Sequence, residues 1–131
     1  MAGLVAVCLA VHRPDPELLR RQLASLDAQT YPERVRVRVD DAEGIGAYRA
    51  FERAFARVPA EAAFVAPCDQ DDVWHPEKLA VLVETVERSG ATLAFSDVRV
   101  VRADGAVVSP TYWTDRTHEC DDLASCSRPT W

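Results

Sequence analysis

The chain has 131 residues, of which 48% are hydrophobic, and its 21 acidic and 15 basic residues give a formal net charge of −6. This size predicts one domain with one core, and no apolar run is long enough to span a membrane. An acidic balance without a basic patch argues against nucleic acid as a partner. The first residues carry no basic stretch, so we expect no secretory signal and a cytoplasmic protein, with a membrane surface as the second option.

Strands and helices alternate from the start of the chain. The apolar run that ends at Val11 is typical of a buried parallel strand. Residues 15–17 supply an N-cap aspartate, a proline and a first-turn acid, which together predict a helix start. Tyr31 and Pro32 end that helix. This alternation predicts an α/β fold whose sheet is mainly parallel and flanked by helices.

The next strand, residues 35–40, alternates valine with arginine. A period of two predicts a strand with one buried face. We expect its other face to lack a covering helix; a solvated edge strand that uses charge against mispairing is the plain alternative, and both can hold. That face carries Arg34, Arg36 and Arg38.

The second half of the chain continues the alternation. The apolar face of a second helix, which Pro59 closes, is marked by Tyr48, Phe51, Phe55 and Val58. The elements predicted after it are a strand at 62–66, a helix from Pro76 to a C′ residue at Gly90, a strand at 91–96, and a hairpin of 98–101 and 106–108 around residues 103–105. Residues 114–131 are polar and show no period, so we expect an irregular tail.

The four cysteines predict no strong metal motif. Cys8 and Cys68 lie in or beside apolar strands and are typical of small buried hydrophobes. Cys120 and Cys126 lie near His118, but their spacing fits no common zinc pattern.

An acidic turn is the most informative feature of the chain. Three carboxylates, those of Asp69, Asp71 and Asp72, fall within four positions between an apolar strand and the helix that Pro76 opens. Such charges repel one another unless a cation or a sugar hydroxyl shares the site. Open α/β folds bind ligands at such strand ends, although a solvated acidic turn is the plain alternative.

This turn, Cys68-Asp69-Gln70-Asp71-Asp72-Val73-Trp74 with Pro76, Lys78 and Leu79, resembles the acidic signature of family 2 nucleotide-sugar glycosyltransferases, which have the GT-A fold. Its closest resemblance is to the rhamnosyltransferase-like branch. Further segments match in family order, and together the resemblance covers residues 4–113; these segments are 5–13, 22–32, 37–41, 46–54, 94–97 and 104–110.

The resemblance implies a GT-A-like nucleotide-binding half over residues 1–113, followed by the tail at 114–131. The chain also departs from the family. Residues 40–44 run almost directly into the next helix, where the family has a longer insertion, and His12 and Arg13 replace the usual Tyr and Asn. The family's second half, with the acceptor site, does not follow. We therefore expect a shortened donor-binding domain.

For the metal, the resemblance assigns Asp71 as the main ligand of Mn²⁺ or Mg²⁺ and Asp69 as its helper or as an acceptor for ribose hydroxyls. Asp72 is expected to cap the following turn or helix. A purely structural role for all three acids is the alternative. Trp74 is expected to pack in the core rather than against a sugar.

For the nucleotide-sugar donor, the resemblance assigns Asp40 or Asp41 to accept a hydrogen bond from the base, against a turn-forming role. His12 is expected to stack on the base or to be an ordinary loop residue, and Arg13 to bind a phosphate or solvent. Asp97, with Ser96, faces the sugar or closes a turn. No catalytic base is identified. The acids of the tail are of the right residue type, but solvated tail residues are the plainer reading; they are Glu119, Asp121 and Asp122.

The function implied is inverting transfer of a sugar from a nucleotide-diphosphate donor to a glycan or other hydroxyl acceptor, with a divalent metal. A second chain that completes the acceptor site is a further expectation. The alternative is a non-catalytic remnant that binds nucleotide or metal, or serves association.

Overall fold

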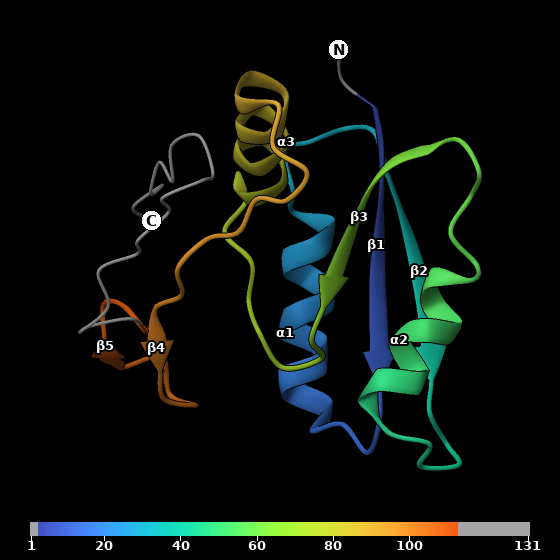
Figure 1. Cartoon of the computed structure of the whole chain (residues 1–131). Helices are drawn as coiled ribbons and strands as arrows, with labels where there is room; N and C mark the ends of the chain where they lie inside the picture. The colour runs from blue at the N-terminus through green and yellow to red at the C-terminus, as the bar shows by residue number, and fades with distance from the viewer. Residues whose placement is uncertain (1–2, 113–131) are drawn as a thin grey trace. The chain divides into compact units, whose positions relative to one another are not determined.

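The computed structural model describes residues 3–112, and the chain divides into two compact units, Met1–Ala80 and Val81–Trp131 (Figure 1). No helix among the described residues is long and apolar enough to cross a lipid bilayer. In chain order the elements are β1 (Leu4–Val11), α1 (Pro16–Asp27), β2 (Arg34–Asp40), α2 (Ala47–Phe55), β3 (Ala62–Cys68), α3 (Lys78–Ser89), β4 (Val100–Val101) and β5 (Val107–Ser109).

The first unit is built on a three-stranded parallel sheet of order β2-β1-β3, which confirms the predicted α/β class. Val11 pairs with Asp40, and Leu9 pairs with Cys68, so the three strands end at one edge of the sheet. The central strand is buried on both faces, which explains its unbroken apolar run. The residues that follow each strand are therefore brought together at this edge.

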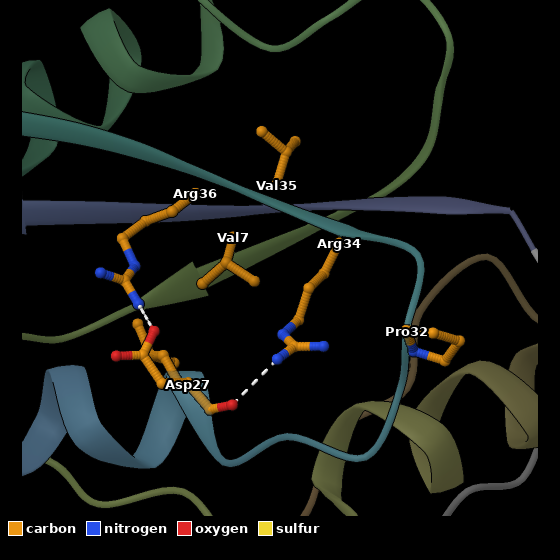
Figure 2. Close-up of a pocket in the computed structure, with 7 residues that line it drawn as sticks. Val7, Asp27, Pro32, Arg34, Val35 and Arg36 are labelled. Carbon is orange, nitrogen blue, oxygen red and sulfur yellow. Dashed lines mark hydrogen bonds and ion pairs between the residues drawn. The ribbon is translucent and has the colours of Figure 1, made fainter.

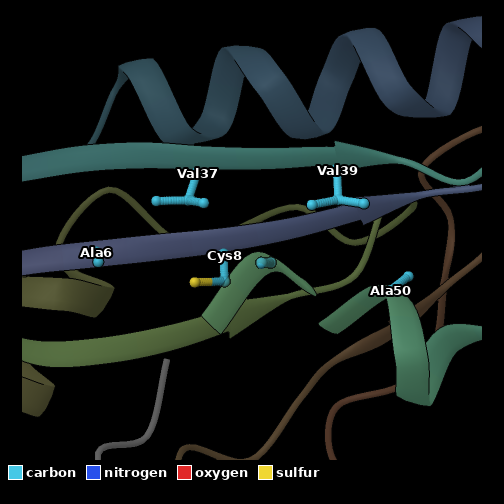
Figure 3. Close-up of a cluster of buried hydrophobic side chains, with 6 residues drawn as sticks. Ala6, Cys8, Val37, Val39 and Ala50 are labelled. Atoms are coloured by element: carbon cyan, nitrogen blue, oxygen red, sulfur yellow. The ribbon is translucent and has the colours of Figure 1, made fainter. Parts of the chain in front are cut away.

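Helix α2 covers one face of the sheet through small side chains (Figure 3). Ala50 and Ala54 are buried against Cys8, with valines of β2 beside them. The prediction that Tyr48, Phe51, Phe55 and Val58 mark the inner face is wrong for Tyr48 and Phe55, which are 84% and 43% exposed, whereas Val58 does pack against this core. Alanines face the core because they let the helix approach the strand closely, and they leave the aromatic side chains outside.

Helix α1 lies over the other face. Its N-cap is Asp15, whose carboxylate accepts from the amides of Glu17 and Leu18, as predicted. At its far end Asp27 binds β2: the guanidinium of Arg36 meets its carboxylate, and that of Arg34 donates to its carbonyl (Figure 2). Within the described residues β2 is an edge strand, but its arginine face meets the last turn of α1 rather than lacking a helix.

The second unit holds most of α3 and the antiparallel hairpin of β4 and β5. Gly105, with φ of +88°, makes the predicted turn, and Gly90, with φ of +69°, ends α3. The strand predicted at 91–96 is wrong: this segment has no strand partner, and Leu93 is 71% exposed. Apolar content alone does not make a strand without a hydrogen-bonding neighbour. The first strand of the hairpin is only Val100–Val101, and α3 begins at Lys78, because Pro76 and Glu77 form a turn.

Candidate functional site

A cavity of about 320 Å³ lies at the edge of the sheet where the strands end. It brings together four predicted site residues from three separate segments: His12 after β1, Asp41 after β2, and Asp69 and Asp71 after β3. The N-terminal part of α2 forms another wall through Ala47, Ala50 and Phe51. These residues lie far apart in the sequence, so the parallel register of the strands assembles the site.

A second cavity, of about 380 Å³, lies between α1 and β2 and is slightly larger (Figure 2). Val7, Leu26, Arg34 and Arg36 are among its lining residues. Both arginines are already bonded to α1 or to the loop after it, because Arg34 also donates to the carbonyl of Tyr31. The cavity at the strand ends gathers the candidate residues and is the better site for a ligand.

His12 is held on both its backbone and its ring. The side chain of Gln70 accepts from the His12 amide at 2.7 Å and donates to the His12 carbonyl at 3.0 Å. The Nδ1 of the His12 ring lies 2.7 Å from the carbonyl oxygen of Asp41. These contacts join the ends of all three strands. The sequence predicts no role for Gln70, since nothing local distinguishes it from an ordinary turn glutamine.

Asp41 shapes the loop that leads into α2. Its carboxylate accepts from the backbone amides of Gly44, Ile45 and Gly46, and its side chain is only 2% exposed. The bond from the Ile45 amide is the main cause that lowers the pKa of this carboxyl below its ordinary value, and the other two amides add to it, against the opposing effect of desolvation. The carboxylate that lines the cavity is thus already committed to the loop.

We expect Asp41→Asn to change how stability depends on pH. Because the folded pKa of Asp41 is depressed, its stabilising contribution is complete above the ordinary Asp pKa of about 4 and is lost as the pH falls through the lower folded value. Urea unfolding from pH 7 to pH 2.5 should show the wild type losing stability more steeply than the variant at the acid end. Asp40→Asn is the control, and equal acid slopes for wild type and Asp41→Asn would contradict the expectation.

Asp40 lies outside the cavity. It is exposed, and its carboxylate accepts from the guanidinium of Arg38, with 2.7 Å between Oδ1 and Nη2. Of the two acids predicted to meet the base, the structure therefore brings only Asp41 to the cavity wall.

The acidic turn presents Asp69 and Asp71 to the cavity, while Asp72 lies beside them and Lys78 follows. Burial is the main cause that raises the pKa of Asp72, and the charges of Asp69 and Asp71 raise it further. The expected capping role of Asp72 is not seen, since its carboxylate accepts no hydrogen bond within residues 3–112. This crowding of negative charge is what a bound cation would relieve.

Three buried polar side chains hold the acidic turn: Gln22 and Ser25 of α1, and Gln29 just after that helix. The Gln22 amide donates to the carbonyl of Asp69 at 2.7 Å, and the Ser25 hydroxyl accepts from the amide of Trp74 at 3.0 Å. Gln29 donates to the carbonyl of His75 and accepts from the amide of Leu79. A helix face with buried polar residues breaks the apolar pattern, and that break is the signal by which the sequence could have revealed them.

Other predicted residues have structural roles or lie elsewhere. Trp74 is buried, with the ammonium of Lys78 4.7 Å from its ring centroid, which confirms core packing. Cys68 is buried and free, and burial, followed by the charge of Asp69, raises the pKa of its thiol to about 12.

In the second unit Asp97 accepts from the Thr111 hydroxyl and the Tyr112 amide, so it closes a turn. The tail candidates lie outside the described residues; they are His118, Glu119, Cys120, Asp121, Asp122 and Cys126.

The fold and the site define a parallel α/β domain with a polar, acidic ligand cavity at its strand ends. A comparison with known protein families matches residues 15–123 to glycosyl transferase family 2, and the chain belongs to this family. The comparison with curated proteins gave no match.

Proposed function

We propose that this domain binds a nucleotide-diphosphate sugar together with a divalent metal ion and serves inverting transfer of the sugar to a hydroxyl acceptor. Membership of family 2 supports glycosyl transfer from a nucleotide-sugar as the reaction class. The single observation that carries the proposal is the meeting of His12, Asp69 and Asp71 in one cavity at the ends of parallel strands.

Asp69 and Asp71 fit a magnesium or manganese ion. No group of three or more His, Cys, Asp or Glu side chains within residues 3–112 is placed to hold a metal by protein ligands alone. Mg²⁺, however, is commonly bound by one or two carboxylates, with phosphate oxygens and water completing its coordination. Two carboxylates on a cavity wall match that donor set. When bound, the ion supplies Lewis acidity that offsets the charge of the departing diphosphate.

The chain's own residues have distinct tasks in this proposal. Asp69 and Asp71 hold the metal, and Asp69 also accepts from ribose hydroxyls when the donor is bound. His12 and the wall of α2 enclose the base, and Gln70 fixes the loop after β1 against the acidic turn. The reaction needs a base to take the acceptor's proton, and residues 3–112 present no clear candidate for it.

The acidic turn and the helix after it also support the rhamnosyltransferase-like branch, which remains part of the proposal. Neither the expected second chain nor the expected membrane surface has support in the described residues.

Nucleotide or metal binding without turnover is the second candidate function. The observation that favours it is that transfer needs a base for the acceptor's proton, and residues 3–112 present no clear candidate for one. Sugar-release assays with an added hydroxyl acceptor separate the two functions, because both predict donor binding but only transfer predicts release.

Calorimetric titration of nucleoside diphosphates with and without Mn²⁺ tests the proposal. We expect Mn²⁺ to raise the affinity of at least one nucleotide by roughly 5- to 150-fold, the usual range of coupling between two ligands. The absence of binding by UDP, CDP, GDP and ADP in saturating Mn²⁺ would contradict the proposed function.

A further inference from the structure

The orientation of His12 is fixed before any ligand binds. Gln70 pairs with both backbone polar groups of His12, at 2.7 and 3.0 Å, in the manner of a neighbouring strand. The ring is fixed independently, because Nδ1 is bonded to the Asp41 carbonyl at 2.7 Å. His12 lines the cavity, and its side chain stays 46% exposed. A residue held in this way presents its remaining polar atom in one direction.

The bond at Nδ1 determines which ring nitrogen carries the hydrogen. A carbonyl oxygen only accepts, so Nδ1 must be the donor in this contact. In the neutral imidazole the other nitrogen, Nε2, is then an acceptor. Within residues 3–112 no group forms a hydrogen bond with Nε2. When the ring is neutral, the cavity wall therefore carries a hydrogen-bond acceptor for which the described part of the chain supplies no donor.

Unlike Nε2 of His12, the two acids that the resemblance assigns to the nucleotide base already bind other groups of the protein. Asp40 is outside the cavity and bound to Arg38, and the carboxylate of Asp41 accepts from three amides. The base of a donor nucleotide would thus meet an imidazole nitrogen in place of a carboxylate.

We propose that His12 is the residue that selects the nucleotide base, by accepting a hydrogen bond at Nε2 from a ring N–H, with Gln70 and Asp41 as its positioning residues. This inference rests on the proposed function and names the substrate class. Uracil, thymine and guanine carry a ring N–H on the edge that pairs in nucleic acids. Cytosine and adenine present a bare nitrogen there, so two lone pairs would face each other.

The test compares two pairs of nucleotides that differ in that hydrogen: UDP with CDP, and GDP with ADP. Their dissociation constants are measured by calorimetry in saturating Mn²⁺ for wild type, His12→Phe and His75→Phe. We expect wild type to favour the N–H partner of at least one pair by about tenfold, the usual cost of leaving a hydrogen-bonding group unpaired. His12→Phe keeps an aromatic face for stacking but removes the acceptor, and its preference should fall below about twofold. His75→Phe should keep the wild-type preference.

The outcomes separate the inference from the function on which it rests. An unchanged preference in His12→Phe, or no preference in wild type, overturns the role of His12 and leaves nucleotide binding intact. If no nucleotide binds wild type, the proposed function fails and the inference falls with it.

A measurement on the ligand-free protein decides the case if His12→Phe does not fold. Nitrogen NMR of ¹⁵N-histidine-labelled protein at pH 8 should show His12 with its hydrogen on Nδ1 and Nε2 bare. A hydrogen on Nε2 would overturn the inference.

Discussion

Asp71→Asn should remove the effect of Mn²⁺ on nucleotide binding while the domain stays folded. The substitution takes one of two carboxylates from the cavity wall, and the described residues offer no third protein ligand nearby. Titrations of the preferred nucleotide with and without Mn²⁺ should then give nearly equal affinities, in place of the roughly 5- to 150-fold difference expected of wild type.

Stability should not fall in the same variant, because the acidic turn is crowded with like charge. The charge of Asp71, with that of Asp69, raises the pKa of Asp72 after the effect of burial, so replacing Asp71 relieves part of the repulsion at neutral pH. We expect thermal unfolding of Asp71→Asn at or above the wild-type temperature. Glu61→Gln removes an exposed acid elsewhere in the first unit and is the matched control for charge. An undiminished Mn²⁺ effect in Asp71→Asn would show that Asp71 is not a ligand.

Gln29→Met should lower the free energy of unfolding by about 2–3 kcal/mol, because it leaves buried hydrogen-bonding groups without partners. Methionine fills similar space but has no hydrogen-bonding groups of comparable strength. The amide of Leu79, which is buried and now donates to Gln29 Oε1 at 3.1 Å, would lose its partner. The carbonyls of Ser25 and His75 would each lose a donor, at 3.2 and 2.8 Å. Differential scanning calorimetry should show a melting temperature lower by on the order of 10 °C.

Arg20→Met, on the preceding helix α1, is the matched control. Arg20 is 66% exposed and pairs with Glu17 on the helix surface, where solvent screens the ion pair, so we expect its loss to change the melting temperature little. Equal melting temperatures for the two variants would mean that the polar residues under the acidic turn contribute no more than a surface pair.

The sequence predicts the first unit well because its elements have strong local signals. The apolar run to Val11, the Asp15 cap and the valine period of β2 each point to one structure, and each is confirmed. The strand at 91–96 fails because a strand depends on a partner that a local pattern cannot supply. The prediction of the inner face of α2 fails for a related reason. The distance between helix and sheet decides whether alanine or tyrosine is buried, and the sequence of the helix alone does not determine that distance.

The sequence predicts which acidic residues lie at the site, but it does not predict what each carboxylate binds. It predicts that His12, Asp41, Asp69 and Asp71 lie after successive strands, and the structure places all four around one cavity. It cannot show that the Asp41 carboxylate is occupied by loop amides, because those bonds depend on the path of the loop. The two hydrogen bonds between the Gln70 side chain and the His12 backbone join residues 58 positions apart, so they are visible only in the folded chain.

The position of β1 at the centre of the parallel sheet has a consequence for synthesis on the ribosome. Its neighbours are both made later, and the second of them ends at Cys68, 57 residues after Val11. At roughly 5–20 residues per second, translation needs several seconds to supply that strand. During this interval a strand that is apolar on both faces cannot be covered by its own domain. Nascent chains of this protein should therefore depend on chaperones more strongly before Cys68 has emerged than after it.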